Sequence, residues 1–213
     1  MKFIRWIKLA IYIIVAFGVS ISHAGSYEDF FAAVKLDDAR TVQTLLARGF
    51  DPNSRDEQGQ AALYLSLREG NFKVAEVLMA QPQLAIDAAN TVRETPLMMA
   101  ALKGHTAWVR RLVERGAQVQ REGWSPLLYA ATGPATDAVQ LLLDKGALID
   151  APSPRGDTPL MMAARFGAES SVGLLLVRGA NRSLRNDRQQ TVVEVAKAAG
   201  RDFLLPQLTS GVK

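Results

Sequence analysis

The chain contains the stretch Thr95-Pro96-Leu97-Met98-Met99-Ala100-Ala101, and the same seven letters recur at residues 158–164. A third copy, Ser-Pro-Leu-Leu-Tyr-Ala-Ala, occupies residues 125–131, and weaker copies begin at Ala61 and Thr191. The aligned apolar anchors of these copies follow one another at spacings of 33, 34, 30, 33 and 33 residues: Phe30, Leu63, Leu97, Leu127, Leu160 and Val193. Self-similarity at this period predicts a solenoid of stacked units.

Each unit has the sequence of two short helices. Thr or Ser before Pro starts a helix, because the hydroxyl caps an orphan N–H and proline at the first helical position loses no hydrogen bond. The Ala-Ala step keeps this helix thin, so that a neighbouring helix can approach closely. A turn at Gly104 or Gly167 leads to a second helix, which ends near Gly116 or Gly179 in the left-handed conformation that glycine adopts. Helices this short are marginal alone, so the units must stack.

These motifs resemble the pattern of ankyrin-repeat proteins. The resemblance rests on Thr-Pro-Leu-x-x-Ala-Ala, on Gly104-His105, and on Gly-Ala at residues 116–117, 146–147 and 179–180. It covers about residues 27–208 as five or six units, with the terminal units acting as caps and residues 209–213 as a tail. It implies an all-α fold, an ankyrin-repeat solenoid of stacked helix-turn-helix units joined by short β-turn fingers.

The chain departs from the family pattern in two places. The family usually has histidine after Thr-Pro-Leu, where it bonds across the turn, but this slot holds Met98, Leu128 and Met161. We therefore expect an apolar substitute for the usual polar network between turns. The spacing of 30 shortens the connection from Val119 to Trp124 by three residues, which predicts a stubby finger.

Composition excludes several classes of function. The 213 residues are 48% hydrophobic and 22% charged, with no cysteine and two histidines, so that disulfides, thiolate metal sites and cysteine nucleophiles are absent. The sequence has no Gly-rich phosphate loop, no His-Glu-x-x-His and no Gly-x-Ser-x-Gly. We therefore expect no catalytic residues, no cofactor, no bound metal and no small-molecule substrate.

The amino terminus has the features of a signal peptide. Lys2, Arg5 and Lys8 precede thirteen uncharged residues, 9–21, and small residues at Ser22 and Ala24 mark a cleavage site before Gly25. The alternative is an uncleaved anchor, but a membrane-spanning helix needs about 20 apolar residues. We expect cleavage after Ala24 and a periplasmic or secreted protein, and the lack of cysteine favours a bacterial periplasm.

Cleavage would make the chain nearly neutral. Three of the 25 basic residues lie in the signal segment, which leaves 22 against 21 acidic residues, a net charge of +1. A nucleic-acid-binding domain needs a retained basic face, so nucleic acid is not an expected partner. Membrane contact is expected only through residues 1–24 if they are retained.

The resemblance places binding on the concave side of the stack, on the finger tips and the first helices. By alignment the finger positions are Glu57, Gln58, Val92, Glu94, Glu122, Trp124, Arg155 and Asp157. The positions on the first helices are Arg68, Glu69, Leu102, Lys103, Thr132, Arg165 and Phe166. An exposed tryptophan is a typical binding anchor, but Trp124 could instead fill the gap left by the shortened finger. Phe166 beside Arg165 is the second candidate anchor.

Other conspicuous residues have structural interpretations. His105 occupies the start of a second helix with no His, Cys or acidic cluster around it. Trp108 falls on the packed side of its helix. The Met98-Met99 and Met161-Met162 pairs could bind copper(I), but one methionine of each pair occupies a packing slot, which favours core packing.

The resulting hypothesis is a non-enzymatic, exported protein-binding module that acts as a protective or inhibitory scaffold for a protein partner of unknown identity. It could hold another exported protein or inhibit a toxic one, as an immunity protein does. The alternative is a membrane-tethered structural adaptor that retains its N-terminal segment.

Overall fold

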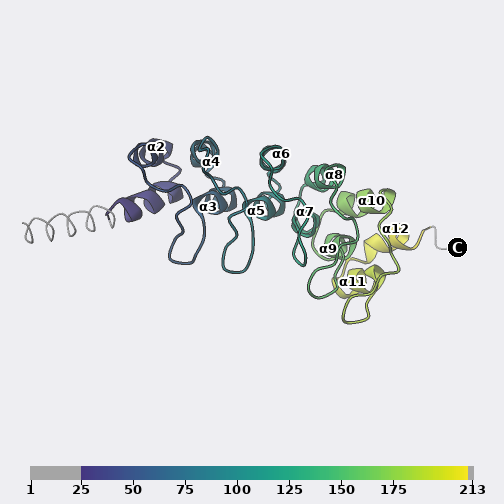
Figure 1. Cartoon of the computed structure of the whole chain (residues 1–213). Coiled ribbons are helices and arrows are strands. Elements are labelled where there is room, and N and C mark those ends of the chain that lie inside the picture. The colour runs from purple at the N-terminus through teal and green to yellow at the C-terminus, as the bar shows by residue number, and fades with distance from the viewer. Residues whose placement is uncertain (1–24, 211–213) are drawn as a thin grey trace, which may run out of the picture.

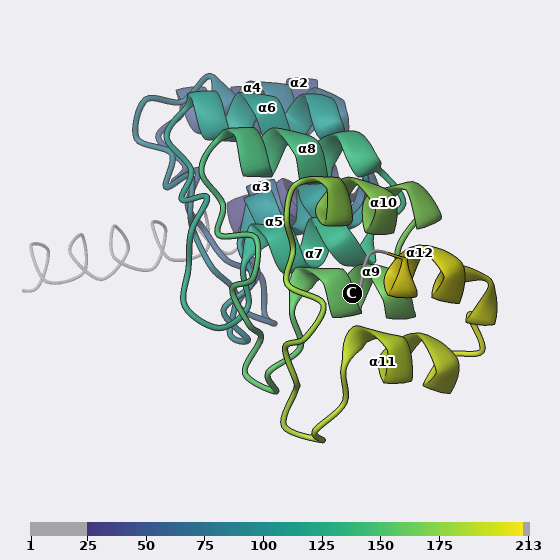
Figure 2. The same ribbon diagram turned by 90° about the vertical axis from the view of Figure 1, so that its right-hand side faces the viewer.

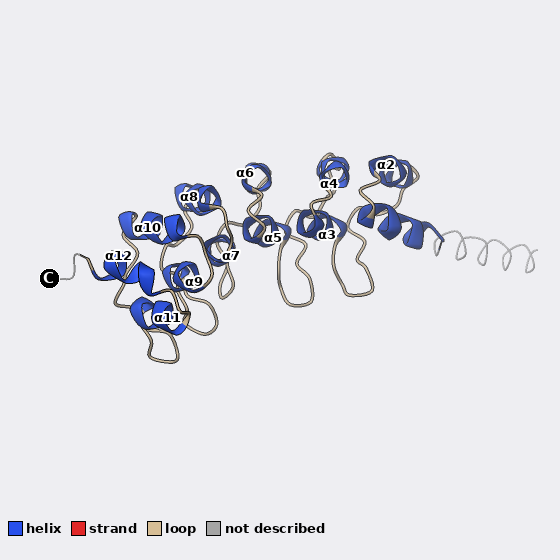
Figure 3. Cartoon of the chain, turned by 180° about the vertical axis from the view of Figure 1, so that it is seen from behind, coloured by secondary structure: helices blue, strands red, loops and turns tan. Residues whose placement is uncertain are grey.

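The computed structural model describes residues 25–210, whose helices stack in two layers. Figure 1 and Figure 2 show the first helices of successive units in one layer and the second helices in the other. The loops between units project on one side of the stack as fingers, and the stack curves towards that side (Figure 1). Figure 3 shows helix and loop throughout the described residues. The predicted all-α stack of helix pairs is confirmed.

The helices have uniform lengths because each unit repeats the same start and stop signals. The first helices, which follow an initial helix over residues 25–35, are α3 (Ala62–Glu69), α5 (Pro96–Leu102), α7 (Pro126–Thr132), α9 (Pro159–Arg165) and α11 (Val192–Ala198). The second helices are α2 (Ala39–Ala47), α4 (Phe72–Met79), α6 (Thr106–Glu114), α8 (Thr136–Asp144) and α10 (Glu169–Val177). The last unit ends in a 3₁₀ turn, η1 (Asp202–Leu204), and α12 (Leu205–Thr209).

Two predictions concern residues that the structure does not describe. The signal segment, residues 1–24, lies outside the described residues, and so do residues 211–213 of the predicted tail. Among residues 25–210, no helix has the length and apolar character needed to cross a bilayer.

The first helices begin as the Thr/Ser-Pro motif predicts. The Thr95 hydroxyl accepts a hydrogen bond from the Met98 N–H at 3.3 Å, and Thr158 makes the same bond with Met161. The Thr95 N–H in turn donates to the Met98 sulfur at 3.5 Å, so a thioether takes part in closing this helix start. Between the last two fingers the expected apolar substitute is wrong, because the Asn186 amide donates to the Asp157 carboxylate at 2.8 Å. All four paired methionines are buried, one more in each pair than the sequence indicated.

The first helices approach one another closely because small residues line their contacts. The alanine pairs that follow the motifs, at residues 100–101, 130–131 and 163–164, are fully buried. A Cβ added at Gly167 would lie 2.0 Å from the Ala131 carbonyl oxygen, and one at Gly133 would lie 2.6 Å from that of Leu102. The backbones of neighbouring units therefore meet where only glycine fits.

Most fingers share one hydrogen-bonded turn. In finger 56–60 the Asp56 N–H donates to the Gln60 carbonyl at 2.9 Å, and the Asp56 carboxylate accepts from the Gln58 and Gln60 N–H groups. The same pattern recurs in fingers 90–94, 153–157 and 186–190, which start at Asn90, Ser153 and Asn186. Within the described residues 119–124 this pattern is missing, so the predicted stubby finger is confirmed.

Candidate protein-binding surface

Two polar clusters join the fingers to the first helices. We call the layer formed by α3, α5, α7, α9 and α11 the palm. The first cluster centres on Glu94 and the second on Asp157, each at the last position of its finger. In both clusters the carboxylate lies next to the residue that caps the following helix, so the helix start fixes where the carboxylate points.

The Glu94 cluster links three consecutive units. Its carboxylate accepts hydrogen bonds from the Tyr64 hydroxyl at 2.7 Å, from the Tyr129 hydroxyl at 2.8 Å and from the Asn90 amide at 2.9 Å. Tyr64 belongs to α3 and Tyr129 to α7, so one carboxylate in the intervening finger connects two helices that flank it. The Arg68 guanidinium lies over the Tyr64 ring, 5.8 Å from its centroid.

The ionisation of this cluster follows from its burial and its hydrogen bonds. Burial alone would raise the pKa of Glu94, but the bonds from Tyr64, Asn90 and Tyr129 and the nearby Arg68 charge outweigh it, so the pKa lies below its ordinary value. Burial, together with the bond to the Glu94 carboxylate, raises the pKa of Tyr64 to about 12, and raises the pKa of Tyr129 as well. At neutral pH the cluster is a carboxylate held by two neutral phenols.

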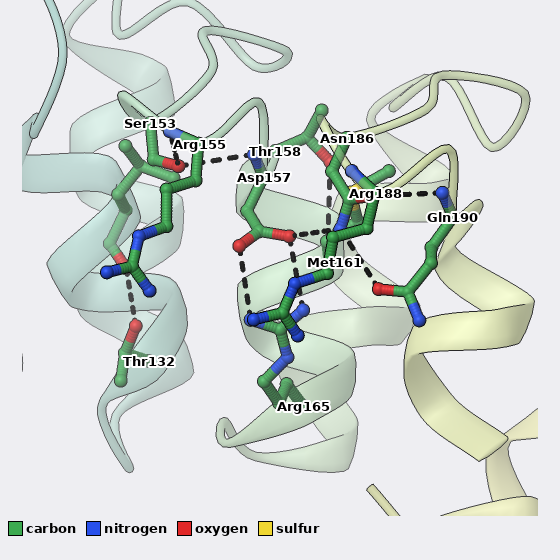
Figure 4. Close-up of polar contacts among 11 residues, drawn as sticks. Thr132, Ser153, Arg155, Asp157, Thr158, Met161, Arg165, Asn186, Arg188 and Gln190 are labelled. Atoms are coloured by element: carbon green, nitrogen blue, oxygen red, sulfur yellow. Dashed lines mark hydrogen bonds and ion pairs between the residues drawn. The ribbon is translucent and has the colours of Figure 1, made fainter. Parts of the chain in front are cut away.

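The Asp157 cluster ties the last two fingers to α9. Figure 4 shows the buried Asp157 carboxylate between Arg165 below it and Asn186 of the next finger. The two Arg165 nitrogens donate at 3.1 and 3.2 Å, and the Asn186 amide donates at 2.8 Å. Asn186 also organises its own finger through its side-chain oxygen, so a change at Asp157 reaches two units.

The two predicted anchors are both exposed. Trp124 is 40% exposed, and its ring meets that of Tyr129 edge-on with centroids 5.8 Å apart. It therefore rests against the Glu94 cluster while part of the indole stays open to solvent. Phe166, at the end of α9, is 59% exposed, and the Arg165 guanidinium lies 5.7 Å from its ring centroid. Binding by either residue remains a prediction.

The other predicted residues divide into paired and free side chains. Arg68 donates to the Glu69 carboxylate and to the Gln60 side chain, both at 2.6 Å, and Arg165 is held by Asp157. Leu102 is half-buried, whereas Lys103, Glu122 and Arg155 are exposed. Figure 4 shows the Arg155 side chain reaching from its finger towards Thr132 on the palm.

Sequence reasoning missed four residues that shape this surface. Tyr64 and Tyr129 were not expected to hold Glu94. Both lie within a first helix, Tyr64 one position after an aligned anchor and Tyr129 two positions after the next but one. Arg93 and Arg121 stand at consecutive finger tips, and neither guanidinium makes a hydrogen bond or ion pair with another residue among those described. The signal that could have identified them is the presence of an arginine in each of two consecutive fingers of the sequence.

His105 has the structural role that the sequence indicated. Its ring stacks edge-on against Phe72 with centroids 4.8 Å apart, and it hydrogen-bonds the backbone of Leu67 in the preceding unit. Burial and the nearby Lys103 charge lower the pKa of His105, so the ring stays neutral at neutral pH. Trp108, also expected in the core, is buried.

The geometry agrees with comparison against known families. The family described as "Ankyrin repeats (3 copies)" matches residues 30–122, 78–153 and 117–186. The chain belongs to the ankyrin-repeat family. Ankyrin repeats are a protein-interaction module, so the palm and fingers described above form the surface of such a module.

Named relatives share the repeats but not their full length. A Caenorhabditis elegans poly [ADP-ribose] polymerase tankyrase is 38% identical over 71 residues, 32% of this chain and 3% of that protein. Ankyrin repeat and SAM domain-containing protein 6 from Mus musculus is 32% identical over 100 residues, 45% of this chain and 11% of that protein. This ankyrin-repeat chain therefore spans a small share of the length of these relatives.

One solved structure is similar over nearly the whole repeat stack. It is titled as the Bd0816 predatory endopeptidase from Bdellovibrio bacteriovorus in complex with immunity protein Bd3460. The similarity has a TM-score of 0.72 at 25% sequence identity, and covers 84% of this chain and 97% of the matched chain.

Proposed function

We propose that this chain is an exported protein-binding module that binds one partner protein on its palm and fingers and restrains it, as an immunity protein does. The observation that carries the proposal is the similarity, over 97% of the matched chain, to a chain from a complex between an endopeptidase and an immunity protein. The partner would be a protein of the same compartment, and the chain itself would do no chemistry.

The palm is suited to such binding because it is preorganised. The Glu94 and Asp157 clusters fix the fingers relative to the helices, so that little ordering entropy opposes association. Stable protein interfaces bury about 800 Å² on each partner, an area that four or five consecutive units can supply. Trp124 and Phe166 then act as exposed apolar anchors among charged side chains.

Export is the part of the proposal that rests on residues 1–24. Their charge pattern supports a cleaved signal peptide, and the competing function is a membrane-tethered adaptor with the segment retained. Mass spectrometry of the chain purified from cells expressing residues 1–213 decides between them. An N-terminus at Gly25 supports export with cleavage, whereas one at Met1 supports the tethered adaptor.

The binding proposal is tested by cross-linking the full-length chain in the intact cell envelope of its host and identifying what is captured. We expect one dominant protein, captured less by Trp124→Ala combined with Phe166→Ala. The control is Leu148→Ala combined with Val177→Ala, which removes two apolar side chains that are at least as exposed as the anchors and that were not predicted as palm or finger anchors. A scatter of unrelated proteins, indifferent to both pairs of changes, contradicts the proposal.

A further inference from the structure

The shortened finger leaves a notch in the row of finger tips. A cavity of about 720 Å³ lies between its neighbours and is lined by Arg93, Arg121, Glu122, Ser153 and Pro154 among others. A second cavity of about 120 Å³ shares Arg93, Arg121 and Pro154 and adds Val92 and Trp124. We call the two together the notch, because they share five lining residues, Glu122 and Gly123 among them.

The notch is lined by more basic than acidic side chains, and its two arginines are not held in ion pairs within residues 25–210. Arg93 and Arg121 line both cavities and make no hydrogen bond or ion pair with another described residue. Several other arginines of the stack are held by carboxylates, for example Arg165 by Asp157 and Arg178 by Asp144. Glu122 is the acidic residue in the lining, so the lining has two basic residues and one acidic residue.

Arg93 occupies a backbone conformation that arginine rarely adopts. Its φ is +67°, and the same left-handed position of the neighbouring fingers holds Gly59, Gly123 and Gly156. Only the last finger also has a side chain there, at Gln189. A non-glycine residue is disfavoured in this region, and such residues concentrate at functional sites. The chain thus keeps an unpaired arginine at a position where glycine would fold more easily.

The apolar part of the notch lies beside these charges. Val92 is 65% exposed and Trp124 is 40% exposed. Pro154 is the third apolar residue of this lining, and its ring packs close to Gly123, since a Cβ added at Gly123 would lie 3.4 Å from it. Exposed apolar side chains next to unpaired cations match a partner segment that combines acidic and apolar residues. Charge complementarity of this kind sets specificity and register at protein interfaces.

We propose that the notch binds an acidic segment of the partner protein, with carboxylates at Arg93 and Arg121 and an apolar side chain against Trp124. This inference rests on the proposed function and adds the chemistry of the partner. Asp56 and Glu57 give the finger at 56–60 the opposite sign, so an acidic segment is disfavoured at that end of the row. A nucleic acid is disfavoured by the same acidic finger and by Glu122 within the notch.

Site-specific photo-cross-linking in the full-length chain tests the proposal in the host cell envelope. p-Benzoylphenylalanine replaces Val92 in the notch, Lys103 on the palm, or the 85% exposed Val177 at the end of α10. We expect capture of the same protein from positions 92 and 103 and not from 177. Peptide mapping of the adduct at position 92 should give a segment rich in Asp and Glu with an apolar residue among them.

Charge removal provides the second readout. Arg93→Gln combined with Arg121→Gln should lower capture at position 92 by about tenfold, in line with losing two charged contacts. Arg40→Gln combined with Arg110→Gln is the matched control, since these arginines are exposed and unpaired among the described residues but lie outside the notch. Arg93→Gly should lower capture without lowering the urea unfolding midpoint, whereas a merely structural arginine would lower the midpoint when removed.

Failure of this inference is distinct from failure of the proposed function. Capture from position 103 without capture from 92, or a mapped segment without acidic residues, overturns the notch and leaves protein binding in place. An adduct at position 92 that is sensitive to nuclease overturns it as well. If no position captures a protein, the proposed function fails and the notch proposal fails with it.

Discussion

Replacing Glu94 by alanine should destabilise the stack more than its half-exposed position suggests. The carboxylate accepts from two tyrosine hydroxyls, at 2.7 and 2.8 Å, that belong to helices on either side of it. Hydrogen bonds to charged groups contribute about 1.5–3 kcal/mol each, and water at the partly exposed site replaces some of this. We expect Glu94→Ala to lower the free energy of unfolding by about 2–3 kcal/mol, and Glu94→Gln, which keeps an acceptor, by about 1 kcal/mol.

The assay is urea and thermal unfolding followed by far-UV circular dichroism and by tryptophan fluorescence, because a solenoid can lose its units in steps. For a domain of this length a loss of 2 kcal/mol lowers Tm by about 4–8 °C. Glu122→Ala removes an exposed carboxylate with no hydrogen bond among the described residues, and should stay within about 0.5 kcal/mol of the parent. A Glu94→Ala change as small as that of the control would refute the linking role of Glu94.

The stability difference between the parent and Glu94→Gln should depend on pH in a direction that the pKa shifts of the cluster determine. The folded state lowers the pKa of Glu94 from 4.5, so its contribution is present above that value and is lost as pH falls through the lowered pKa. The folded state raises the pKa of Tyr64 from 10.0 to about 12, so its contribution is present below 10 and is lost as pH rises towards 12. The stability difference between parent and Glu94→Gln should therefore be flat between about pH 5 and 9 and shrink on either side.

Three further outcomes are expected. Gly167→Ala should destabilise the stack by several kcal/mol or prevent folding, because its Cβ would lie 2.0 Å from a carbonyl oxygen. The control is Gly173→Ala within α10, whose Cβ would lie 3.6 Å from the end of a flexible side chain. This control should be neutral or stabilising by up to about 1 kcal/mol in urea unfolding. Asp157→Ala should cost about 2–3 kcal/mol in the same assay, since it leaves Arg165 and Asn186 without their shared acceptor. Trp124→Ala should change Tm by less than about 4 °C yet reduce partner capture, and a larger drop would make the indole a packing residue.

The fold was predictable from the sequence because each unit repeats signals that act locally. Thr-Pro sets the start of a first helix and glycine ends a second one, so that the period, the helix order and the shortened finger could all be read directly. The burial of both methionines in each pair was not predictable, because a short helix packed on both sides has no exposed face to distinguish them.

The polar clusters were less predictable because they depend on contacts about 30 residues apart. Nothing local to Tyr64 indicates that its hydroxyl meets a carboxylate from the next finger, since that contact exists only once the units stack. Arg165 was predicted as a binding residue from its position alone, yet Asp157 on the same unit holds it. The exposure of Phe166 followed from its position in the repeat, whereas the sequence left Trp124 open between an exposed anchor and a residue packed into the shortened finger.

The Glu94 and Asp157 clusters fix the two fingers that lie on either side of the notch. In a solenoid each unit contacts only its neighbours, so a finger is rigid only where bonds fix it. Fingers 90–94 and 153–157 have closed turns, and their last residues, Glu94 and Asp157, are bound to the palm. The finger between them lacks the closed turn. A partner segment entering the notch therefore lies between two fixed fingers, with the shortened finger between them. Loosening either fixed finger should weaken binding even where no contact with the partner is lost. Glu94→Ala releases the finger that carries Arg93 from the palm without removing Arg93. This variant therefore separates the effect of a fixed finger on partner binding from the effect of direct contacts.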